Sequence, residues 1–361
     1  MFRRKFLKTS LIGAGALATD LIHPAAMAAQ RANTTPGADN VKTSSSGQQV
    51  PTSAKTRPIQ IRMGGYGPPT TGFSVGLKMI GDRLKSKFGK DVEIKYVYNI
   101  MDLGYRAEDI LWLVEDGVLT LGYQSSSYFT DRVPDLGVAD LPFIFASTES
   151  ARGAIDGKFG TLVTRKIEER MNYRILGYYE NGFRHISNRL RPVRLPADLK
   201  GMRIRVLPSR IQARTFELLG AEPLIMDLTE ALARIPAGTL DAQENPFANT
   251  VTYGVHKYHH FHTATNHFYL SRPIFLHRTS FDAWPVELQQ AMREAVQEAI
   301  QFQRGVHIKE EEDAAIAIRK EGGEIIELTP AEHDAFVAAV KPLYREVRGQ
   351  FDPEMLAAVG L

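Results

Sequence analysis

An alternation of strand-like and helix-like segments from residue 59 onward constrains the fold of this chain more than any other feature. Ile59–Met63 alternates apolar and polar residues, as a half-buried strand does, and Thr70–Phe88 repeats apolar residues at helical spacing. The next strand, helix and strand are predicted at Val92–Tyr98, Tyr105–Asp116 and Leu119–Tyr123. This order of elements predicts a parallel sheet with helices on its faces.

The pattern starts again in the second half of the chain, which predicts a second α/β domain. Met202–Leu207 has the pattern of a strand, Ser209–Leu219 and Asp227–Pro236 those of helices, and Phe261–Phe275 that of extended chain. Ligands of such sheets bind beyond the carboxyl ends of strands, and clefts between domains are preferred sites for small ligands. We therefore expect an α/β protein of two domains with a ligand cleft between them.

A long helix is predicted at Pro285–Gly322, because apolar residues recur through it, a proline opens it and glycines follow it. At 1.5 Å per residue it would be about 55 Å long, enough to run along both domains. We assign residues 58–181 and 271–310 to the first domain, and residues 182–270 and 311–361 to the second.

The residues before the first strand are expected to be an export leader and a linker. Residues 1–28 combine the basic stretch Arg3–Lys8 with a short apolar segment and an Ala-Met-Ala cleavage site, which predicts a signal peptide and a periplasmic location. The adjacent arginines favour the twin-arginine route, with an ordinary Sec leader as the alternative. Residues 29–57 are rich in Ser, Thr, Gly and Asn, which predicts a disordered linker.

Charge and cysteine content exclude several classes of function. The full chain has a formal net charge of +3, and the predicted leader accounts for all of it. The remaining chain therefore lacks the clustered positive charge that nucleic acids or anionic membranes require, and we expect neither nucleic-acid binding nor stable membrane insertion of the mature chain. The absence of cysteine removes disulfides, thiolate metal sites and cysteine nucleophiles.

The candidate binding motif is Gly201–Asn245, in which a strand ends in Arg205 and is followed by a helix and by a polar turn at Gly238–Pro246. A guanidinium group presents a planar fork of donors that matches a carboxylate. The chain contains no H-E-x-x-H, G-x-S-x-G or P-loop motif. We therefore predict a binder of a small organic anion, with no enzymatic activity and no cofactor.

Two other clusters allow alternative interpretations. Five histidines have spacings that a metal site could use, but no carboxylate joins them locally, so a metal-dependent enzyme is the weaker interpretation. These histidines are His256, His259, His260, His262 and His267. The acidic run Glu310–Asp313 is predicted to be a solvated helix face, with a docking patch for a membrane subunit as the alternative.

Four stretches, taken together in their order and spacing, connect the chain to a known family. They are Val133–Phe143, Asn181–Arg189, Asp198–Val206 and Leu218–Pro246. These stretches resemble the substrate-binding subunits of tripartite ATP-independent periplasmic (TRAP) transporters, the dicarboxylate-binding-protein family. The resemblance implies a type II periplasmic-binding fold that closes on its ligand by hinge bending, and delivery of the ligand to TRAP membrane subunits for ion-driven uptake. A receptor for a sensor or for an ABC-type permease remains the alternative.

The same resemblance implies roles for individual residues. Arg205 matches the arginine that binds the ligand carboxylate, Arg184 a second cationic contact, and Asn245 an amide that hydrogen-bonds the ligand. The other expected ligand-binding residues are Ser209, Gln124, Ser125 and Tyr66, with the aromatic residues Tyr123, Tyr128 and Phe247 near the predicted cleft. Two alternatives stay open: Arg205 in a structural ion pair, and Asn245 as the N-cap of a helix starting near Pro246. The identity of the acid, and any cation bridging it to the protein, also stay open.

Overall fold

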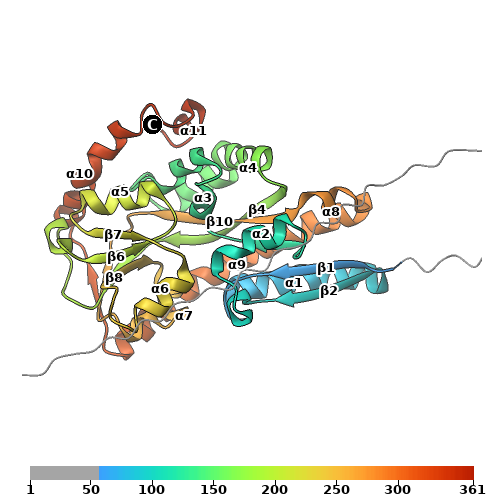
Figure 1. Cartoon of the computed structure of the whole chain (residues 1–361), viewed down its shortest axis with the longest axis horizontal. Helices are drawn as coiled ribbons and strands as arrows, with labels where there is room; N and C mark the ends of the chain where they lie inside the picture. Colours follow the sequence, from blue (N-terminus) through green and yellow to red (C-terminus); the bar gives the residue numbers. More distant parts are fainter. Residues whose placement is uncertain (1–56) are drawn as a thin grey trace, which may run out of the picture. The chain divides into compact units, whose positions relative to one another are not determined.

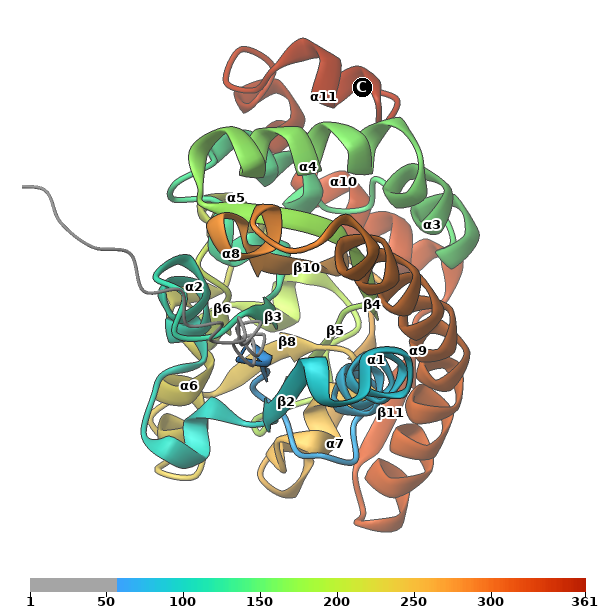
Figure 2. The same ribbon diagram turned by 90° about the vertical axis from the view of Figure 1, so that its right-hand side faces the viewer.

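The structure, a computed structural model, describes residues 57–361. The predicted signal peptide (1–28) and, except for its last residue, the predicted linker (29–57) lie outside the described residues. The described chain forms two β-sheets with helices packed around them, which confirms the α/β class (Figures 1 and 2).

The first sheet has the strand order β2-β1-β3-β10-β4. Its strands are β1 (Ile59–Gly64), β2 (Val92–Val97), β3 (Leu121–Tyr123), β4 (Tyr173–Phe183) and β10 (Tyr269–His277). β1 pairs in parallel with β2 and β3, as the sequence pattern predicts. β10 lies between β3 and β4 and is antiparallel to both, so the sheet is mixed and not parallel throughout. The pattern of the first half of the chain could not reveal this strand, because β10 comes much later in the sequence, directly after strand β9 of the second sheet.

The second sheet has the strand order β11-β9-β5-β8-β6-β7. Its strands are β5 (His185–Asn188), β6 (Arg203–Val206), β7 (Glu222–Ile225), β8 (Ala242–Asn245), β9 (Phe261–Ala264) and β11 (Glu324–Glu327). The prediction of a polar turn at Gly238–Pro246 is wrong over its second half, because β8 is a buried strand between β5 and β6. Its polar side chains are buried because they bond to one another and to residues of the neighbouring elements.

The helices have the following bounds. They are α1 (Gly72–Phe88), α2 (Ile110–Glu115), α3 (Thr148–Asp156), α4 (Lys158–Arg170), α5 (Arg210–Leu218), α6 (Leu228–Arg234), α7 (Phe247–Thr252), α8 (Arg278–Asp282), α9 (Val286–Lys320), α10 (Pro330–Glu346) and α11 (Pro353–Ala357). Short 3-10 turns connect them, among them η3 (Ala107–Asp109), η4 (Ser126–Phe129) and η7 (Val255–Lys257).

Helix α9 confirms the predicted long helix and touches both halves of the described chain. It packs against α1 and β4 on the side of the first sheet, and against α7 and β11 on the side of the second; Figure 2 shows α1 lying alongside it. It begins after Pro285 and ends before Gly322, as the sequence indicates.

The acidic run on α9 is only partly the solvated face that the sequence predicts. Glu312 and Asp313 are exposed, but Glu310 and Glu311 are half-buried. Glu310 Oε1 accepts a hydrogen bond of 2.6 Å from the first backbone N–H of α1, and Glu311 accepts from the first two N–H groups of α7. Carboxylates stabilise helix N-termini. Two consecutive residues of α9 therefore each stabilise the start of another helix: Glu310 that of α1 and Glu311 that of α7.

Two large clusters of buried apolar side chains follow the two sheets. The first surrounds β1, β3, β4 and β10 and includes Leu77 and Phe275; the second surrounds β6 and includes Ile204 and Phe216. α10 contributes Phe336 to the second cluster and Leu343 to the first. The division into two domains with the boundaries given above stays a prediction.

Gly182 marks the point where the chain passes from the first sheet to the second. Its φ of +82° is in the left-handed region, and a Cβ there would lie 2.4 Å from His307 Nε2. Only glycine meets both conditions without strain. Gly182 lies beside a register irregularity in the pairing of β4 with β10, and Asn181 and Arg184, before and after it, both line the same cavity.

Candidate functional site

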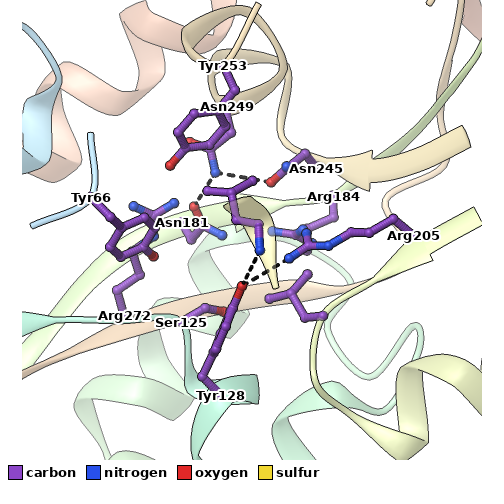
Figure 3. A pocket seen from close by; sticks show the side chains of 12 residues that line it. Tyr66, Ser125, Tyr128, Asn181, Arg184, Arg205, Asn245, Asn249, Tyr253 and Arg272 are labelled. Atoms are coloured by element: carbon purple, nitrogen blue, oxygen red, sulfur yellow. Dashed lines mark hydrogen bonds between the residues drawn. The ribbon is translucent and has the colours of Figure 1, made fainter. Parts of the chain in front are cut away.

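A narrow cavity lies between residues of the two sheets. The free space inside it is only about 20 Å³, enough for about one water molecule. It is lined by Tyr66, Ser125, Tyr128, Asn181, Arg184, Arg205, Leu207, Leu228, Asn245, Asn249, Tyr253 and Arg272 (Figure 3). Several of these follow the carboxyl ends of strands, among them Tyr66 after β1 and Ser125 after β3. This is where ligands of α/β sheets bind.

Arg205 extends from β6 into the cavity and is 2% exposed. Its Nε donates to the carbonyl oxygen of Met226 at 3.1 Å, and its Nη2 donates to Tyr128 Oη at 3.0 Å. Within residues 57–361, no carboxylate oxygen comes within 4.0 Å of its guanidinium group. Arg205 is therefore not in a structural ion pair, and three of its five N–H donors have no protein acceptor.

Arg184 is equally buried but has a counter-charge. Its Nη2 donates to Glu244 Oε1 at 2.8 Å and to the Glu244 carbonyl oxygen at 2.8 Å, and its Nε donates to Glu244 Oε2. Burial alone would raise the pKa of the Glu244 carboxyl, but Arg184, with His267 as a further partner, offsets this and lowers it. The pair is thus ionised, and its planar geometry fixes the Arg184 side chain at the cavity wall.

Three asparagines form a hydrogen-bonded row along one side of the cavity. Asn249 Nδ2 donates to Asn181 Oδ1 at 2.9 Å and to Asn245 Oδ1 at 3.2 Å, and Asn245 Nδ2 donates to Gln243 Oε1 at 3.0 Å. Asn245 ends β8, and Pro246 occupies the N-cap position of α7. The alternative interpretation of Asn245 as a helix cap is therefore wrong.

Two hydroxyl groups in the cavity have protons to donate. Tyr128 Oη accepts hydrogen bonds from Arg205 Nη2 and from the Leu228 backbone N–H, so its own proton is not used by either. Burial raises the pKa of Tyr128, which keeps that proton in place at neutral pH. Ser125 Oγ is buried and has no hydrogen-bond partner among the described residues.

The opposite wall is aromatic and surrounds a third buried arginine. The Arg272 guanidinium lies 4.0 Å from the centre of the Phe73 ring, 4.9 Å from that of Tyr66 and 5.8 Å from that of Tyr123. Its Nε is buried with no hydrogen-bond partner among the described residues. Figure 3 shows Tyr66 and Arg272 on one side of the cavity and Arg205 on the other.

The structure brings together five of the seven residues expected to bind the ligand and leaves two outside the cavity lining. The five are Tyr66, Ser125, Arg184, Arg205 and Asn245. Gln124 is buried beside them, where its Nε2 donates to the Ala107 carbonyl oxygen and its Oε1 accepts from the Ser125 N–H. Ser209 Oγ accepts from the Gln212 N–H and serves as the N-cap of α5. The ligand contacts of all seven stay a prediction.

Sequence reasoning missed four polar residues of the cavity: Asn181, Asn249, Tyr253 and Arg272. Arg272 left a local signal, since a charged residue inside the apolar run of β10 needs a polar partner when buried. Asn249 and Tyr253 left none, because they lie at helical spacing on α7 and at its C-cap, where polar residues are common.

The histidine-rich region does not form a metal site in the part of the chain that the structure describes. No group of three or more His, Cys, Asp or Glu side chains is placed there to hold a metal ion. His259 Nδ1 is bonded to Ser187 Oγ, and His262 Nε2 to the His259 carbonyl oxygen. Burial lowers the pKa of both, to about 3 for His259 and about 4 for His262, so they are neutral packing residues at physiological pH.

Within residues 57–361 no helix combines the length and the apolar character that a membrane crossing requires. Two mixed sheets with a narrow, donor-rich cavity between them define a protein that binds a small solute. Residues 64–350 match the model of the bacterial extracellular solute-binding proteins, family 7 (DctP), and the chain belongs to that family. The resemblance drawn from the sequence motifs is thereby confirmed.

Individual relatives are similar along most of their length. The chain is 28% identical to the 2,3-diketo-L-gulonate-binding periplasmic protein YiaO of Escherichia coli, over 81% of this chain and 86% of that protein. It is 26% identical to the C4-dicarboxylate-binding periplasmic protein DctP of Rhodobacter capsulatus, over 85% and 91%. A TRAP periplasmic solute-binding protein from Sulfurospirillum deleyianum, solved with bound succinate, superposes with a TM-score of 0.78 at 24% identity, over 83% and 98%. This last match supports the fold alone.

Proposed function

We propose that this protein is a periplasmic receptor that captures a small organic carboxylate in the cavity and delivers it to TRAP membrane subunits for uptake. The observation that carries the proposal is the excess of unused donors: three N–H groups of Arg205, the Tyr128 hydroxyl proton and the Ser125 hydroxyl. A buried cation with spare donors is costly without an anion, so the site favours a ligand that supplies one.

In this proposal Arg205 is the main anchor of the carboxylate. Arg184, held in place by Glu244, orients the ligand, and Asn245 hydrogen-bonds it from the asparagine row. Most of the lining side chains are nearly inaccessible to solvent, for example Asn245 at 4%, so we expect the ligand to enter by an opening of the two halves. Bending around α9, which touches both halves, is the motion we propose.

The relatives support an organic acid as the ligand. The names of the E. coli and R. capsulatus proteins identify a keto sugar acid and C4-dicarboxylates as their ligands. We also infer a binding role without catalysis and a periplasmic location from membership of this family. A receptor that serves a sensor or an ABC-type permease would use the same cavity, and co-purification with a TRAP membrane subunit, a sensor or a permease would separate these partners.

A thermal-shift screen tests the proposal. The mature protein, from about Ala29, is unfolded and refolded to remove bound ligand, then screened against mono-, di-, keto-, sugar and aromatic acids, each paired with its amide. A ligand at 100 times its Kd should add about 2.7 kcal/mol of stability. A shift with an acid but not its amide supports the proposal. The absence of a shift with every acid contradicts it.

A further inference from the structure

We propose that Arg272 is a second anion anchor, so that the site takes a ligand with two anionic groups, one held by Arg205 and one by Arg272. This inference rests on the carboxylate-receptor function proposed above and specifies the ligand class. It assigns a specificity role to a residue on β10 that lies outside all four of the motifs that identify the family.

The first step is the charge balance of the cavity. Three arginines line it, and the Arg184 charge is neutralised by Glu244. In the described chain no carboxylate oxygen lies within 4.0 Å of either Arg205 or Arg272. The cavity therefore holds two buried positive charges without counter-ions, and a ligand with a single charge would leave one of them uncompensated.

The second step is the geometry at Arg272, which is 3% exposed. The rings of Phe73 and Tyr66 contact its guanidinium group through cation–π attraction. That attraction involves the ring faces and provides no acceptor for N–H donors in the guanidinium plane. Nε has no acceptor among the described residues, and the Tyr253 hydroxyl lies near enough to accept from another N–H of the group. A carboxylate approaching in this plane would meet the donors that the rings leave free.

The third step is that no nearby acid is positioned to be the missing partner. Burial raises the pKa of Glu310 and the Arg272 charge partly opposes this rise, so Glu310 lies near Arg272; however, its Oε1 accepts from the Gly72 N–H at 2.6 Å and it forms no ion pair with Arg272. The other titratable groups around Arg272 are Tyr66, Tyr123 and Tyr253, together with His307, whose pKa burial and the Arg272 charge lower to about 4, so that it is neutral. Burial raises the pKa of each phenol, so all three are neutral at physiological pH.

The fourth step concerns the placement of the two unpaired arginines. Arg205 belongs to β6 of the second sheet and Arg272 to β10 of the first, and they lie on opposite sides of the cavity in Figure 3. A ligand with an anionic group at each end would join the two sheets through two charge-assisted contacts.

Calorimetric titration of matched ligand pairs tests this inference. The probes are succinate against succinamate, glutarate against glutaramate, and galactarate against galactonate, so that each pair differs in one carboxylate. Three ligand-stripped proteins are titrated: the wild type, Arg272→Met, and Arg293→Met as the control. Arg293 also lies against an aromatic ring, that of Phe281 at 5.0 Å, but on exposed α9 outside the cavity.

The wild type and the control should bind the dianion of at least one pair about 30-fold or more tightly than its single-charge partner. Arg272→Met should reduce that ratio below about threefold, mainly by weakening the dianion. Should Arg272→Met prove unfolded by circular dichroism, Arg272→Gln, which keeps a polar side chain, replaces it with the same expectation.

Two results would overturn the second anchor while leaving the receptor function intact. One is a wild type that binds single-charge acids as tightly as dianions in every pair. The other is an Arg272 variant that keeps the wild-type ratio. A wild type that binds none of these acids, and shifts with no acid in the thermal screen, would instead remove the receptor function, and this inference with it.

Discussion

Arg184 and Arg205 are buried on either side of strand β8, yet their electrostatic surroundings are opposite. Arg184 is bonded through three contacts to Glu244, which lies on β8 itself. Arg205 has only a carbonyl oxygen and a phenol oxygen as partners. The comparison teaches that burial alone does not identify a ligand-binding arginine. A buried charge with an internal partner is already compensated within the protein, whereas one without such a partner is left for a ligand to compensate.

The largest expected effect comes from removing the carboxylate partner of Arg184, so that this arginine, like Arg205, has no counter-charge. Glu244→Gln leaves the buried Arg184 charge without a counter-ion and places an amide N–H against a guanidinium N–H. We expect a loss of about 3–5 kcal/mol in the free energy of unfolding, measured by urea denaturation.

Glu346→Gln is the matched control for Glu244→Gln. Glu346 also accepts two hydrogen bonds from an arginine, Arg214, but that pair is on the surface. Exposed pairs contribute little, so this variant should unfold at nearly the wild-type urea concentration. Equal effects of the two substitutions would show that Arg184 does not depend on Glu244.

The second effect tests the unpaired arginine. Arg205→Met removes the proposed anchor and should weaken binding of the organic acid by about 2 kcal/mol or more, as measured by calorimetry. Stability without ligand should fall less than in Glu244→Gln, because no buried charge is left without its partner. Arg203→Met is the control, since Arg203 lies two residues earlier on β6, pairs with Asp241 and does not line the cavity. Wild-type affinity in Arg205→Met would contradict the comparison.

The difference between the two arginines also explains how much the sequence could predict. Both were found from motifs around their strands, because strand ends of α/β folds are where ligands bind. Glu244 could not be recognised as the partner of Arg184, since the prediction treated its segment as a polar turn. Glu244 is placed beside Arg184 by the pairing of β8 with β5 and β6, which is a long-range contact.

Long-range strand pairing also limits what could be predicted in the rest of the molecule. Strands and helices with clear periodicity, such as β1 and α9, were predicted nearly to their ends. The antiparallel insertion of β10, and with it the position of Arg272, depends on pairing with β3 and β4 from far along the chain. Local pattern carries no information about such partners.

A third effect follows from two carboxylates, one buried and one half-buried, whose surroundings shift their pKa values in opposite directions. Glu244 has cationic partners and a lowered pKa, whereas burial raises the pKa of Glu311 to about 7, opposed by the N–H groups of Ala248 and Phe247. The unfolded chain releases this proton near pH 4.5 and the folded chain only near pH 7. The stabilisation from Glu311 is therefore complete below pH 4.5 and is lost as the pH rises to about 7.

Glu311→Gln removes that titration. The stability of the variant relative to the wild type should rise by about 3 kcal/mol between pH 4.5 and pH 7.5 in urea denaturation series. Glu312→Gln, a substitution at the exposed neighbouring position, should give a curve parallel to that of the wild type. If the stability of Glu311→Gln also changed with pH in parallel with the wild type, the Glu311 carboxyl of the wild type would have an ordinary pKa. The contrast with Glu244 would then fail.

The smallest effect concerns Ser209, for which the family pattern and the local geometry imply different roles. The pattern implies a ligand contact, but Ser209 Oγ accepts from the Gln212 N–H at 3.3 Å and caps α5. Ser209→Ala should cost about 1 kcal/mol of stability and leave the Kd for the acid unchanged, as Ser147→Ala should at the cap of α3. A tenfold rise in Kd for Ser209→Ala alone would mean that α5 shifts on closure and brings the hydroxyl to the ligand. Ser209 would then contact the ligand directly, as Arg205 is proposed to do, and its capping of α5 would describe only the conformation before closure.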